Sequence, residues 1–557
     1  MRGTKKNELT TISYGADTVN IDGPPQDEKR SQKALIAEAQ IGFADEKELG
    51  PRAALKAYPN AVLWSLAFAA CVIMEGYDTA LLGSFYAYPA FQIRFGRFVG
   101  VTPSTPSGYQ LTAAWQAGMG QAGGVGSFFG AALNGYMVPR WGQRRVVIGS
   151  LIVLIIGIFF PFFASNLIVL TVGELICGFP WGILTTCATS YASEVLPTSL
   201  RVYLTSFTNM CFIIGQLIAA GILKGLSNHI NPWAYRIPFA IQWVWPCFLI
   251  PLVYFAPESP WYLVRKGHLD DAEKSLRRFQ NPKANINPTN TLAAIIHTDN
   301  FEKTHEVGTT YLDCFKGAEL RRTEIACMVL TGQILCGINF AYNSSYFFEN
   351  VGVGTSTTYS LNLGGTFLAL FGCFVNWFAL MPYIGRRTIY VWGMAVMTVI
   401  LIVIGILNVW THHKRIAMTQ AVLTLAWTLI FQFSAGQLGW ALPAEMGSTR
   451  LRQKTICIAR NANGVVGIVA GVLQQYFMNP QAWNLKGYVG FVWGGTCFLM
   501  FLWAFFRLPE TWNRSYQELD ILFAKRIPAR KFASTEVDLF EDQEIGLDFR
   551  EAPADLG

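Results

Sequence analysis

One long apolar stretch ends in Tyr191-Ala-Ser-Glu194-Val-Leu-Pro-Thr-Ser-Leu-Arg201, and a later one ends in Ala444-Glu445-Met-Gly-Ser-Thr-Arg450-Leu-Arg452. In both, an arginine lies seven residues after a glutamate. Two further apolar stretches are followed by Trp141-Gly-Gln-Arg144-Arg145 and by Ile384-Gly385-Arg386-Arg387. Chance explains one such match easily and two poorly. The sequence therefore predicts a chain of two repeated halves.

The composition indicates that much of the surface faces something other than water. Of 557 residues, 52% are hydrophobic and 14% are charged, whereas soluble domains carry roughly 25% charged residues. A helix needs about 20 mostly apolar residues to cross a bilayer. Stretches of this kind predict an all-α membrane protein of twelve transmembrane helices in two six-helix halves, at residues 61–83, 111–137, 145–164, 168–190, 203–224, 237–256, 324–347, 360–382, 387–408, 418–442, 455–477 and 488–506.

Polar segments flank and divide these halves. We expect a disordered tail over residues 1–60, a first half over 61–256, a linker over 257–323, a second half over 324–507 and a tail over 508–557. Within the linker, Asp270–Phe279 has the spacing and end charges of a short amphipathic helix.

The orientation follows from the basic residues, because Lys and Arg are enriched on the cytosolic side of membrane proteins. They cluster in both tails, in the linker and in the turns at Arg144 and Arg386. These parts are predicted to be cytosolic, with one exception to the charge rule on the outer side at His412, His413, Lys414 and Arg415.

Acidic and basic residues at the predicted cytosolic helix ends can form charge-assisted pairs. Such pairs would hold the two halves together in one state and break in another, although the same charges could simply stop membrane insertion. The candidate gating residues are Arg144, Arg145, Glu194, Arg201, Glu258, Arg386, Arg387, Glu445 and Arg452.

Several longer strings are typical of one family: Gly76-Tyr77-Asp78, Pro257-Glu258-Ser259-Pro260, Gly385-Arg386-Arg387, and Gln333 followed by Gly337-Ile338-Asn339. On these strings the chain resembles the sugar porters of the major facilitator superfamily over about residues 60–520. It is most similar to fungal maltose and α-glucoside proton permeases, on Met74–Thr79, Cys177–Gly182 and Ser448–Thr455. The resemblance implies the major facilitator fold, with substrate bound between the halves near the membrane midplane.

The resemblance also implies a set of sugar-binding positions. Amide side chains suit a sugar because each offers a donor and an acceptor to adjacent hydroxyls, and an aromatic ring suits the apolar face of a pyranose. The alternative is that the amides bridge helices. In the seventh predicted span (324–347) the family has two adjacent glutamines, and this chain has Gln333 and then Ile334. The implied positions are Asn209, Gln333, Asn339, Asn343 and Trp440.

Two acids in the first predicted helix are candidates for proton coupling. Glu75 and Asp78 are three residues apart and share a helix face. Ionisable residues inside a membrane are costly and usually functional, and the resemblance implies that Asp78 is the proton site. Where the family has a Gly-Arg pair, this chain has Gly173-Glu174. We expect Glu174 to be neutralised by Arg460 or a backbone donor, and not to be a second proton site.

A second departure from the α-glucoside permeases lies at Asn463-Gly464, where they show a tyrosine and then an asparagine. The predicted function is proton-coupled uptake of a sugar, most simply an α-glucoside such as maltose, across the plasma membrane. The alternatives are a facilitator or exporter of another small polar molecule, and a non-transporting sugar sensor, although such sensors usually carry a longer C-terminal tail.

The expected partners are the sugar, protons and the lipid bilayer, and both termini are expected in the cytosol. We expect a monomer with no metal or other cofactor and no nucleic-acid partner. An enzyme is not expected, because the polar segments hold no phosphate loop, nucleophile elbow or metal-ligand cluster.

Overall fold

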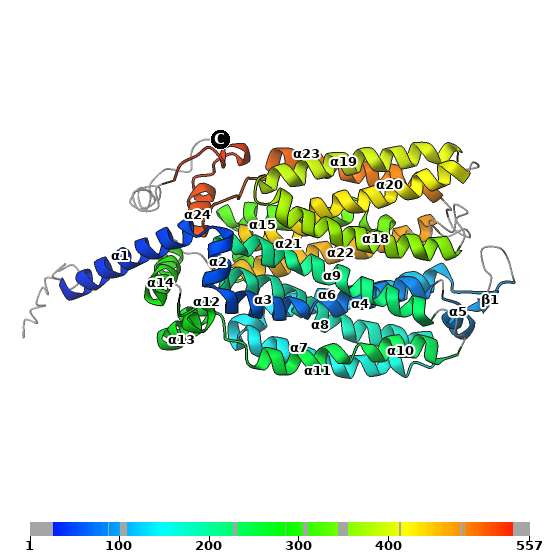
Figure 1. Ribbon diagram of the computed structural model, residues 1–557, viewed down its shortest axis with the longest axis horizontal. Coiled ribbons are helices and arrows are strands. Elements are labelled where there is room, and N and C mark those ends of the chain that lie inside the picture. The colour runs from blue at the N-terminus through cyan, green and yellow to red at the C-terminus, as the bar shows by residue number, and fades with distance from the viewer. Residues whose placement is uncertain are drawn as a thin grey trace, which may run out of the picture.

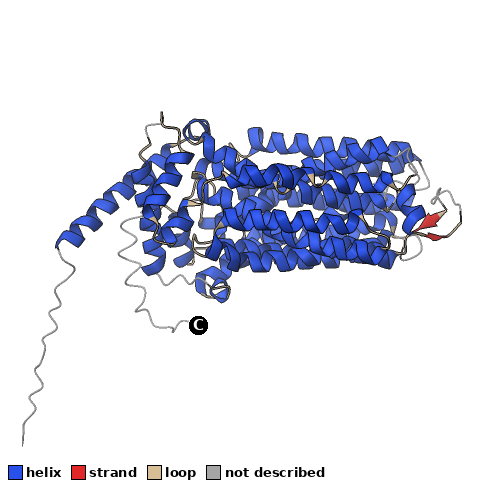
Figure 2. Cartoon of the chain, turned by 90° about the horizontal axis from the view of Figure 1, so that it is seen from below, coloured by secondary structure: helices blue, strands red, loops and turns tan. Residues whose placement is uncertain are grey.

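The computed structural model describes residues 26–86, 88–100, 108–226, 231–283, 286–304, 310–342, 355–410, 414–478, 483 and 485–537. In these ranges the chain is helical apart from one antiparallel hairpin, in which β1 (Arg97–Phe98) pairs with β2 (Tyr109–Gln110). Long helices run side by side in an elongated bundle (Figure 1). The strands lie at one end of it, the hairpin end, and the shorter outer helices gather at the other, the linker end (Figure 2).

The first half of the bundle follows the predicted spans. Its fourth span begins where the Asn166 side chain accepts a hydrogen bond from the Val169 N–H (2.9 Å), a cap that satisfies an otherwise free backbone donor. The helices are α3 (Pro59–Ala70), α4 (Ile73–Phe85), α5 (Pro89–Phe95), α6 (Ala113–Trp141), α7 (Gln143–Phe162), α8 (Leu167–Val195), α9 (Thr198–Leu226), α10 (Trp233–Ile241) and α11 (Val244–Tyr254).

The second half repeats this arrangement with breaks in two of its spans. Gly337, at φ 94°, separates α15 from α16 in a left-handed conformation that favours glycine. Ser434 separates α20 from α21. The helices are α15 (Gly317–Leu335), α16 (Ile338–Tyr342), α18 (Thr355–Val375) continuing as η2 (Asn376–Leu380), α19 (Arg386–Leu407) with η3 (Asn408–Trp410), α20 (Lys414–Phe433), α21 (Ala435–Met446), α22 (Arg452–Met478), η4 (Lys486–Tyr488) and α23 (Val489–Arg507).

Outside the bundle, the linker end carries short helices from both termini and from the linker. The predicted amphipathic helix is confirmed as α13, which buries Leu276 and Phe279. The disordered tail expected over residues 1–60 is wrong for 26–57, most of which is helical because α1 finds a packing partner in α14. These helices are α1 (Gln26–Glu48), α2 (Pro51–Ala57), α12 (Pro260–Arg265), α13 (Leu269–Phe279), α14 (Pro288–Thr304), η1 (Leu312–Phe315), α24 (Tyr516–Ala524) and η5 (Ala529–Lys531).

Eleven helical segments of the described chain are long and apolar enough to cross a membrane. Large apolar side chains such as Phe248 and Trp392 lie exposed on their outer faces, as lipid contact requires. The remaining predicted span, α6, has 29 residues but is rich in glycine, so its mean hydropathy is lower. Its length and its packing against α8 and α22 make it the twelfth helix. The predicted all-α membrane fold is confirmed.

The glycines of α6 allow it to pack closely against α8. A Cβ atom on Gly130 would lie 2.0 Å from the Phe179 carbonyl oxygen, and one on Gly178 would lie 2.1 Å from that of Gly123. Small residues permit this approach of two backbones inside a membrane. The glycines that reduce the mean hydropathy of α6 are therefore also the residues that allow it to pack closely against α8.

Replacing Gly130 with alanine should destabilise the protein by about 1–3 kcal/mol, because the added methyl group forces the two backbones apart. Thermal unfolding of the purified protein in detergent measures this. Gly118→Ala is the matched control on the same helix, where a Cβ atom would meet nothing within 4 Å. Equal melting temperatures for the two variants would contradict the close α6–α8 contact.

Candidate functional site

A cavity of about 430 Å³ lies between the two halves of the bundle, which is within the usual range for small-molecule sites. Its lining comes from α4, α6, α8 and α9 of the first half and from α15, α16, α18, α20, α21 and α22 of the second. Asn343 lies outside the described residues, and Glu174 lies behind the lining. The predicted site residues that line the cavity are Glu75, Asp78, Asn209, Gln333, Asn339, Trp440 and Arg460.

The cavity extends toward the hairpin end. Its lining includes Leu82 and Tyr86 at the end of α4, Gln116 near the start of α6 and Gln475 near the end of α22, all of which lie in that direction. Sequence reasoning missed several polar lining residues, whose only signal was an amide or hydroxyl in an otherwise apolar helix: Gln116, Gln121, Gln216, Asn362, Thr366, Thr424, Thr428 and Gln475.

Two of the predicted sugar-binding amides also hold helices together. The Asn209 Nδ2 donates to the Gln432 Oε1 (2.6 Å), which links α9 of the first half to α20 of the second. The Gln333 Nε2 donates to the carbonyl oxygens of Ala435 (3.1 Å) and Gly436 (2.8 Å), next to the break between α20 and α21. Both amides line the cavity, so helix bridging and ligand contact are compatible at these positions.

The aromatic site residue Trp440 contacts Phe212 and Arg460 and also lines the cavity. Its ring stacks on Phe212 of α9, with centroids 5.7 Å apart and an interplanar angle of 22°. The guanidinium carbon of Arg460 lies 5.5 Å from its centroid. Trp440 and Phe212 therefore form a stacked aromatic pair in the cavity wall, with one ring from each half. Phe212 was not predicted from the sequence.

Arg460 pairs with Glu75 and not with Glu174, so the predicted pairing of Glu174 with Arg460 is wrong. The Arg460 Nη2 donates to the Glu75 carboxylate, which also accepts a hydrogen bond from the Thr185 hydroxyl. This ion pair joins the two halves at the base of the cavity, which no sequence pattern indicated.

Asp78 turns away from that ion pair, toward α8 and α10. It accepts a hydrogen bond from the Gln242 side chain at the end of α10. The carboxyl group of Glu174 lies within hydrogen-bonding reach of the Asp78 carboxyl group, and both side chains are 1% exposed. The two acids on α4 thus have separate partners, although both line the cavity.

At the linker end of the first half, Glu194 and Glu258 bind the turn between α6 and α7. Glu258 accepts hydrogen bonds from the backbone N–H groups of Gln143 (3.0 Å) and Arg144 (3.4 Å). Glu194 accepts one from the Gln143 side chain (3.1 Å) and one from the Ser259 hydroxyl (2.5 Å). Burial raises the pKa of Glu258, and its backbone donors oppose that shift.

The second half repeats this arrangement with Glu445 and Glu510. Glu510 accepts hydrogen bonds from the backbone N–H groups of Arg386 (2.9 Å) and Arg387 (3.2 Å). Glu445 accepts one from the Thr511 hydroxyl (2.7 Å) and lies 3.3 Å from the Arg386 Nε. Burial likewise raises the pKa of Glu510. In each half, therefore, one glutamate binds the backbone N–H groups of the turn and another contacts the side chain of the first of these turn residues, Gln143 or Arg386.

The repeat corrects the predicted role of Arg144. Gln143 occupies the position that Arg386 has in the second half, so the first half contacts Glu194 through an amide. The Arg144 guanidinium instead lies 5.8 Å from the ring centroid of Tyr254. Arg145 is exposed at the same turn and forms no ion pair with any described residue.

Arg201 and Arg452, the arginines of the repeated motifs, meet at one aromatic ring. Tyr516 of α24 lies between them, with guanidinium carbons 3.8 Å and 3.7 Å from its centroid. The expected pairing with a glutamate is wrong for Arg452, which is fully buried and forms no ion pair in the described chain. The face of an aromatic ring attracts a cation, so Tyr516 joins the two halves through one arginine from each.

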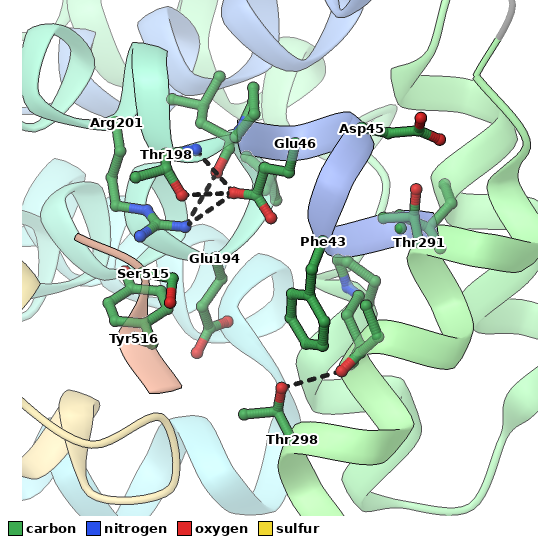
Figure 3. A pocket seen from close by; sticks show the side chains of 18 of the residues that line it. Phe43, Asp45, Glu46, Glu194, Thr198, Arg201, Thr291, Thr298, Ser515 and Tyr516 are labelled. Carbon is green, nitrogen blue, oxygen red and sulfur yellow. Dashed lines mark hydrogen bonds and ion pairs between the residues drawn. The ribbon is translucent and has the colours of Figure 1, made fainter. Parts of the chain in front are cut away.

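Two further glutamates cap the helices that follow these motifs. Glu46 of α1 accepts hydrogen bonds from the Thr198 N–H (2.7 Å) and hydroxyl (2.6 Å) at the start of α9, beside Arg201 (Figure 3). Glu302 of α14 accepts the same pair from Thr449, at 2.6 Å and 2.7 Å, just before α22. Because α1 packs against α14, one unit outside the bundle caps both halves.

Sequence reasoning missed Glu46, Glu302 and Glu510. A signal existed for Glu510, because the Pro-Glu-Thr string at 509–511 repeats the Pro-Glu-Ser string at 257–259. Neither Glu46 nor Glu302 belongs to a repeated string. The contacts of all these residues close the linker end, while the cavity extends to the hairpin end.

Comparison with known proteins gives this arrangement a family. Residues 64–523 match the family model described as "Sugar (and other) transporter". The chain belongs to the sugar transporter family. The transporter is 37% identical to maltose permease MAL61 of Saccharomyces cerevisiae over 96% of its length and 87% of the permease. It is also 37% identical to alpha-glucosides permease MPH3 of the same species, over 96% of its length and 90% of that permease.

The transporter also resembles solved structures of the xylose transporter XylE from E. coli. The structure of this proton:xylose symporter bound to 6-bromo-6-deoxy-D-glucose matches with a TM-score of 0.70 and 21% identity, over 83% of the transporter and 98% of XylE. The inward open conformation of XylE matches with a TM-score of 0.57. The fold is therefore that of the major facilitator superfamily, and the transporter is a multi-pass membrane protein that carries a sugar.

Glu46→Ala should lower the stability of the transporter by about 0.5–2 kcal/mol, the usual effect of losing a helix cap. Thermal unfolding in detergent measures the loss. Asp45→Ala is the matched control, because Asp45 points away from the Thr198 cap (Figure 3). If both variants melt like the unchanged protein, the α1 cap contributes nothing to the closed linker end.

Proposed function

We propose that the transporter imports an α-glucoside such as maltose across the plasma membrane, together with protons. The observation that carries this proposal is the buried Asp78 beside a cavity lined with amides and aromatic rings. Relatives that match almost the whole chain are named maltose and alpha-glucosides permeases, which supports this substrate class. The linker end, rich in basic residues, faces the cytosol, so the cavity takes substrate from outside.

In this mechanism the sugar enters between the two halves and contacts both. Amides of Gln121 and Gln216 from the first half and Asn362 from the second face the same cavity. Hydroxyl groups of a sugar can exchange water for these donors and acceptors, while Trp440 packs on a pyranose face. Binding then draws the halves together at the hairpin end, and the contacts at the linker end open.

Proton coupling through Asp78 distinguishes a symporter from a facilitator. An ionised carboxylate at this depth is unfavourable by at least about 2.5 kcal/mol on insertion scales. A proton on Asp78 removes that cost before the halves exchange sides. A facilitator needs no such group, and a non-transporting sensor would bind sugar without accumulating it.

The substrate and the coupling are tested together by uptake of labelled mono- and disaccharides into cells that lack their own carriers, with external pH recorded. Concentrative uptake of maltose or another α-glucoside with alkalinisation of the medium is the expected result. Accumulation without proton movement would exclude proton symport. Entry of sugar without accumulation would indicate a facilitator, and binding without entry would indicate a sensor.

Asp78→Asn should abolish concentrative uptake, because the asparagine side chain cannot carry the coupled proton. Exchange of labelled for unlabelled sugar at equal concentrations should survive, since it requires no net proton movement. That exchange also serves as the control for folding and delivery to the membrane. An Asp78→Asn variant that still accumulates sugar against a gradient would place the proton elsewhere.

Trp440→Ala should raise the half-saturation concentration about tenfold or more. By analogy with stacking of bases on aromatic side chains, the lost ring is worth about 1–3 kcal/mol, and about 1.4 kcal/mol corresponds to tenfold in affinity. Trp440→Phe keeps an aromatic face and should show a smaller increase. Concentration series of uptake measure both variants, and an unchanged value for Trp440→Ala would exclude a stacking role.

A further inference from the structure

The buried pair Asp78 and Glu174 has one hydrogen-bond donor, Gln242, among the described residues. Asp78 on α4 and Glu174 on α8 are each 1% exposed, and their carboxyl groups are neighbours. One Asp78 oxygen accepts from Gln242. The other Asp78 oxygen and both oxygens of Glu174 have no donor in the described chain. Three buried carboxyl oxygens of two neighbouring acids thus lack a hydrogen-bond donor among the described residues.

Two ionised carboxylates cannot share such a position, because like charges in contact repel and burial removes the water that would screen them. A single proton resolves both problems. It leaves one negative charge on the pair, and it converts one carboxylate into a donor that the other accepts. Groups coupled in this way take up and release protons as a pair.

We propose that Asp78 and Glu174 form a carboxyl dyad that holds the transported proton between them. This inference rests on the proposed proton coupling and adds Glu174 to it, contrary to the role expected from the sequence. The proton comes from the external solution and leaves to the cytosol, and only O–H bonds form and break. Glu174 acts as a proton-binding group behind the cavity wall, while Asp78 is the member of the dyad that reaches the cavity.

No described cation faces the dyad. Arg460 on α22 is engaged by Glu75. The other titratable neighbours are Tyr77 on α4, Tyr86 just after α4, and Cys177, one turn from Glu174 on α8. Tyr77 donates its hydroxyl to the Pro238 carbonyl oxygen (2.8 Å) and Tyr86 donates to that of Gln116 (3.0 Å). None of these groups is a base that would compete for the proton. The dyad and the Glu75–Arg460 ion pair are therefore separate groups: the ion pair is neutral, and the proton reduces the charge of the dyad from two to one.

Glu174→Gln tests the dyad, because it keeps the side-chain size and removes the second acid. Its amide can donate to Asp78 and so favours the ionised form of that group. Uptake of labelled maltose should then need more acid, with half-maximal uptake at an external pH lower by about one unit. Glu174→Asp keeps an acid at the position and should remain close to the unchanged transporter.

A second measurement makes the test independent of the sugar. Infrared difference spectra of the purified, full-length protein follow the carbonyl stretch of protonated carboxyl groups over the pH range in which carboxylic acids and histidines titrate. The unchanged protein should show one common transition of the two acids. Asp78→Asn and Glu174→Gln should each remove part of that transition and move the remainder to lower pH. Both readouts unchanged in Glu174→Gln would overturn the dyad.

The outcomes separate the two proposals. Proton-driven uptake with an unshifted Glu174→Gln variant would keep Asp78 as the coupling acid and reject the shared proton. A shared transition in the infrared spectra, without proton-driven uptake of any sugar tested, would keep the dyad and reject the symport proposal. If Glu174→Gln does not fold, the Asp78→Asn spectrum still tests the dyad. Glu174 should then titrate at a lower pH than the common transition of the unchanged protein, and an unshifted transition would overturn the dyad.

Discussion

A charged side chain inside a membrane bundle must find a partner or a proton, because desolvation costs on the order of several kcal/mol per ion. This constraint organises the centre of the sugar transporter. Glu75 and Arg460 neutralise each other across the two halves, so their contact exists only while α4 and α22 meet at the base of the cavity. Asp78 and Glu174 have no such cation, and a proton is the partner available to them. The two acids on α4, one turn apart, thus have different partners: Glu75 has an arginine, and Asp78 has a second acid with which it can share a proton.

The glutamates at the linker end also find partners, which here are backbone N–H and hydroxyl donors. Glu258 and Glu510 each bind backbone N–H groups at a turn, and Glu46 and Glu302 each cap a threonine before the next helix. At the two turns the chemistry is the same because the Pro-Glu-Ser string at 257–259 and the Pro-Glu-Thr string at 509–511 repeat. The ring of Tyr516 contacts Arg201 of the first half and Arg452 of the second, and so it links the two halves. Closing this end therefore depends on segments outside the bundle, which lie far from the cavity.

Much of this could be predicted from the order of residues. Apolar lengths predicted the membrane spans, and the repeated Glu-to-Arg spacing identified two halves and the end of the bundle at which their charged residues gather. The helix α6 was found by length and motif although its glycines reduce its hydropathy. Gln333 and Trp440 were predicted to belong to one sugar-binding site, and both line one cavity, together with the predicted proton site Asp78. These successes share a reason, since each depends on local spacing or on strings that resemble a known family.

The sequence by itself determined the number of spans, their order, the positions of the motifs and the presence of acids within α4 and α8. Only the tertiary structure decided which charged and polar groups meet. It pairs Arg460 with Glu75 across 385 positions, leaves Glu174 beside Asp78, gives Gln143 the place expected for an arginine and brings Glu46 from the N-terminal segment to Thr198. Those contacts depend on the rotation and tilt of helices that pack by their side-chain ridges, and no local pattern specifies how distant helices turn toward one another.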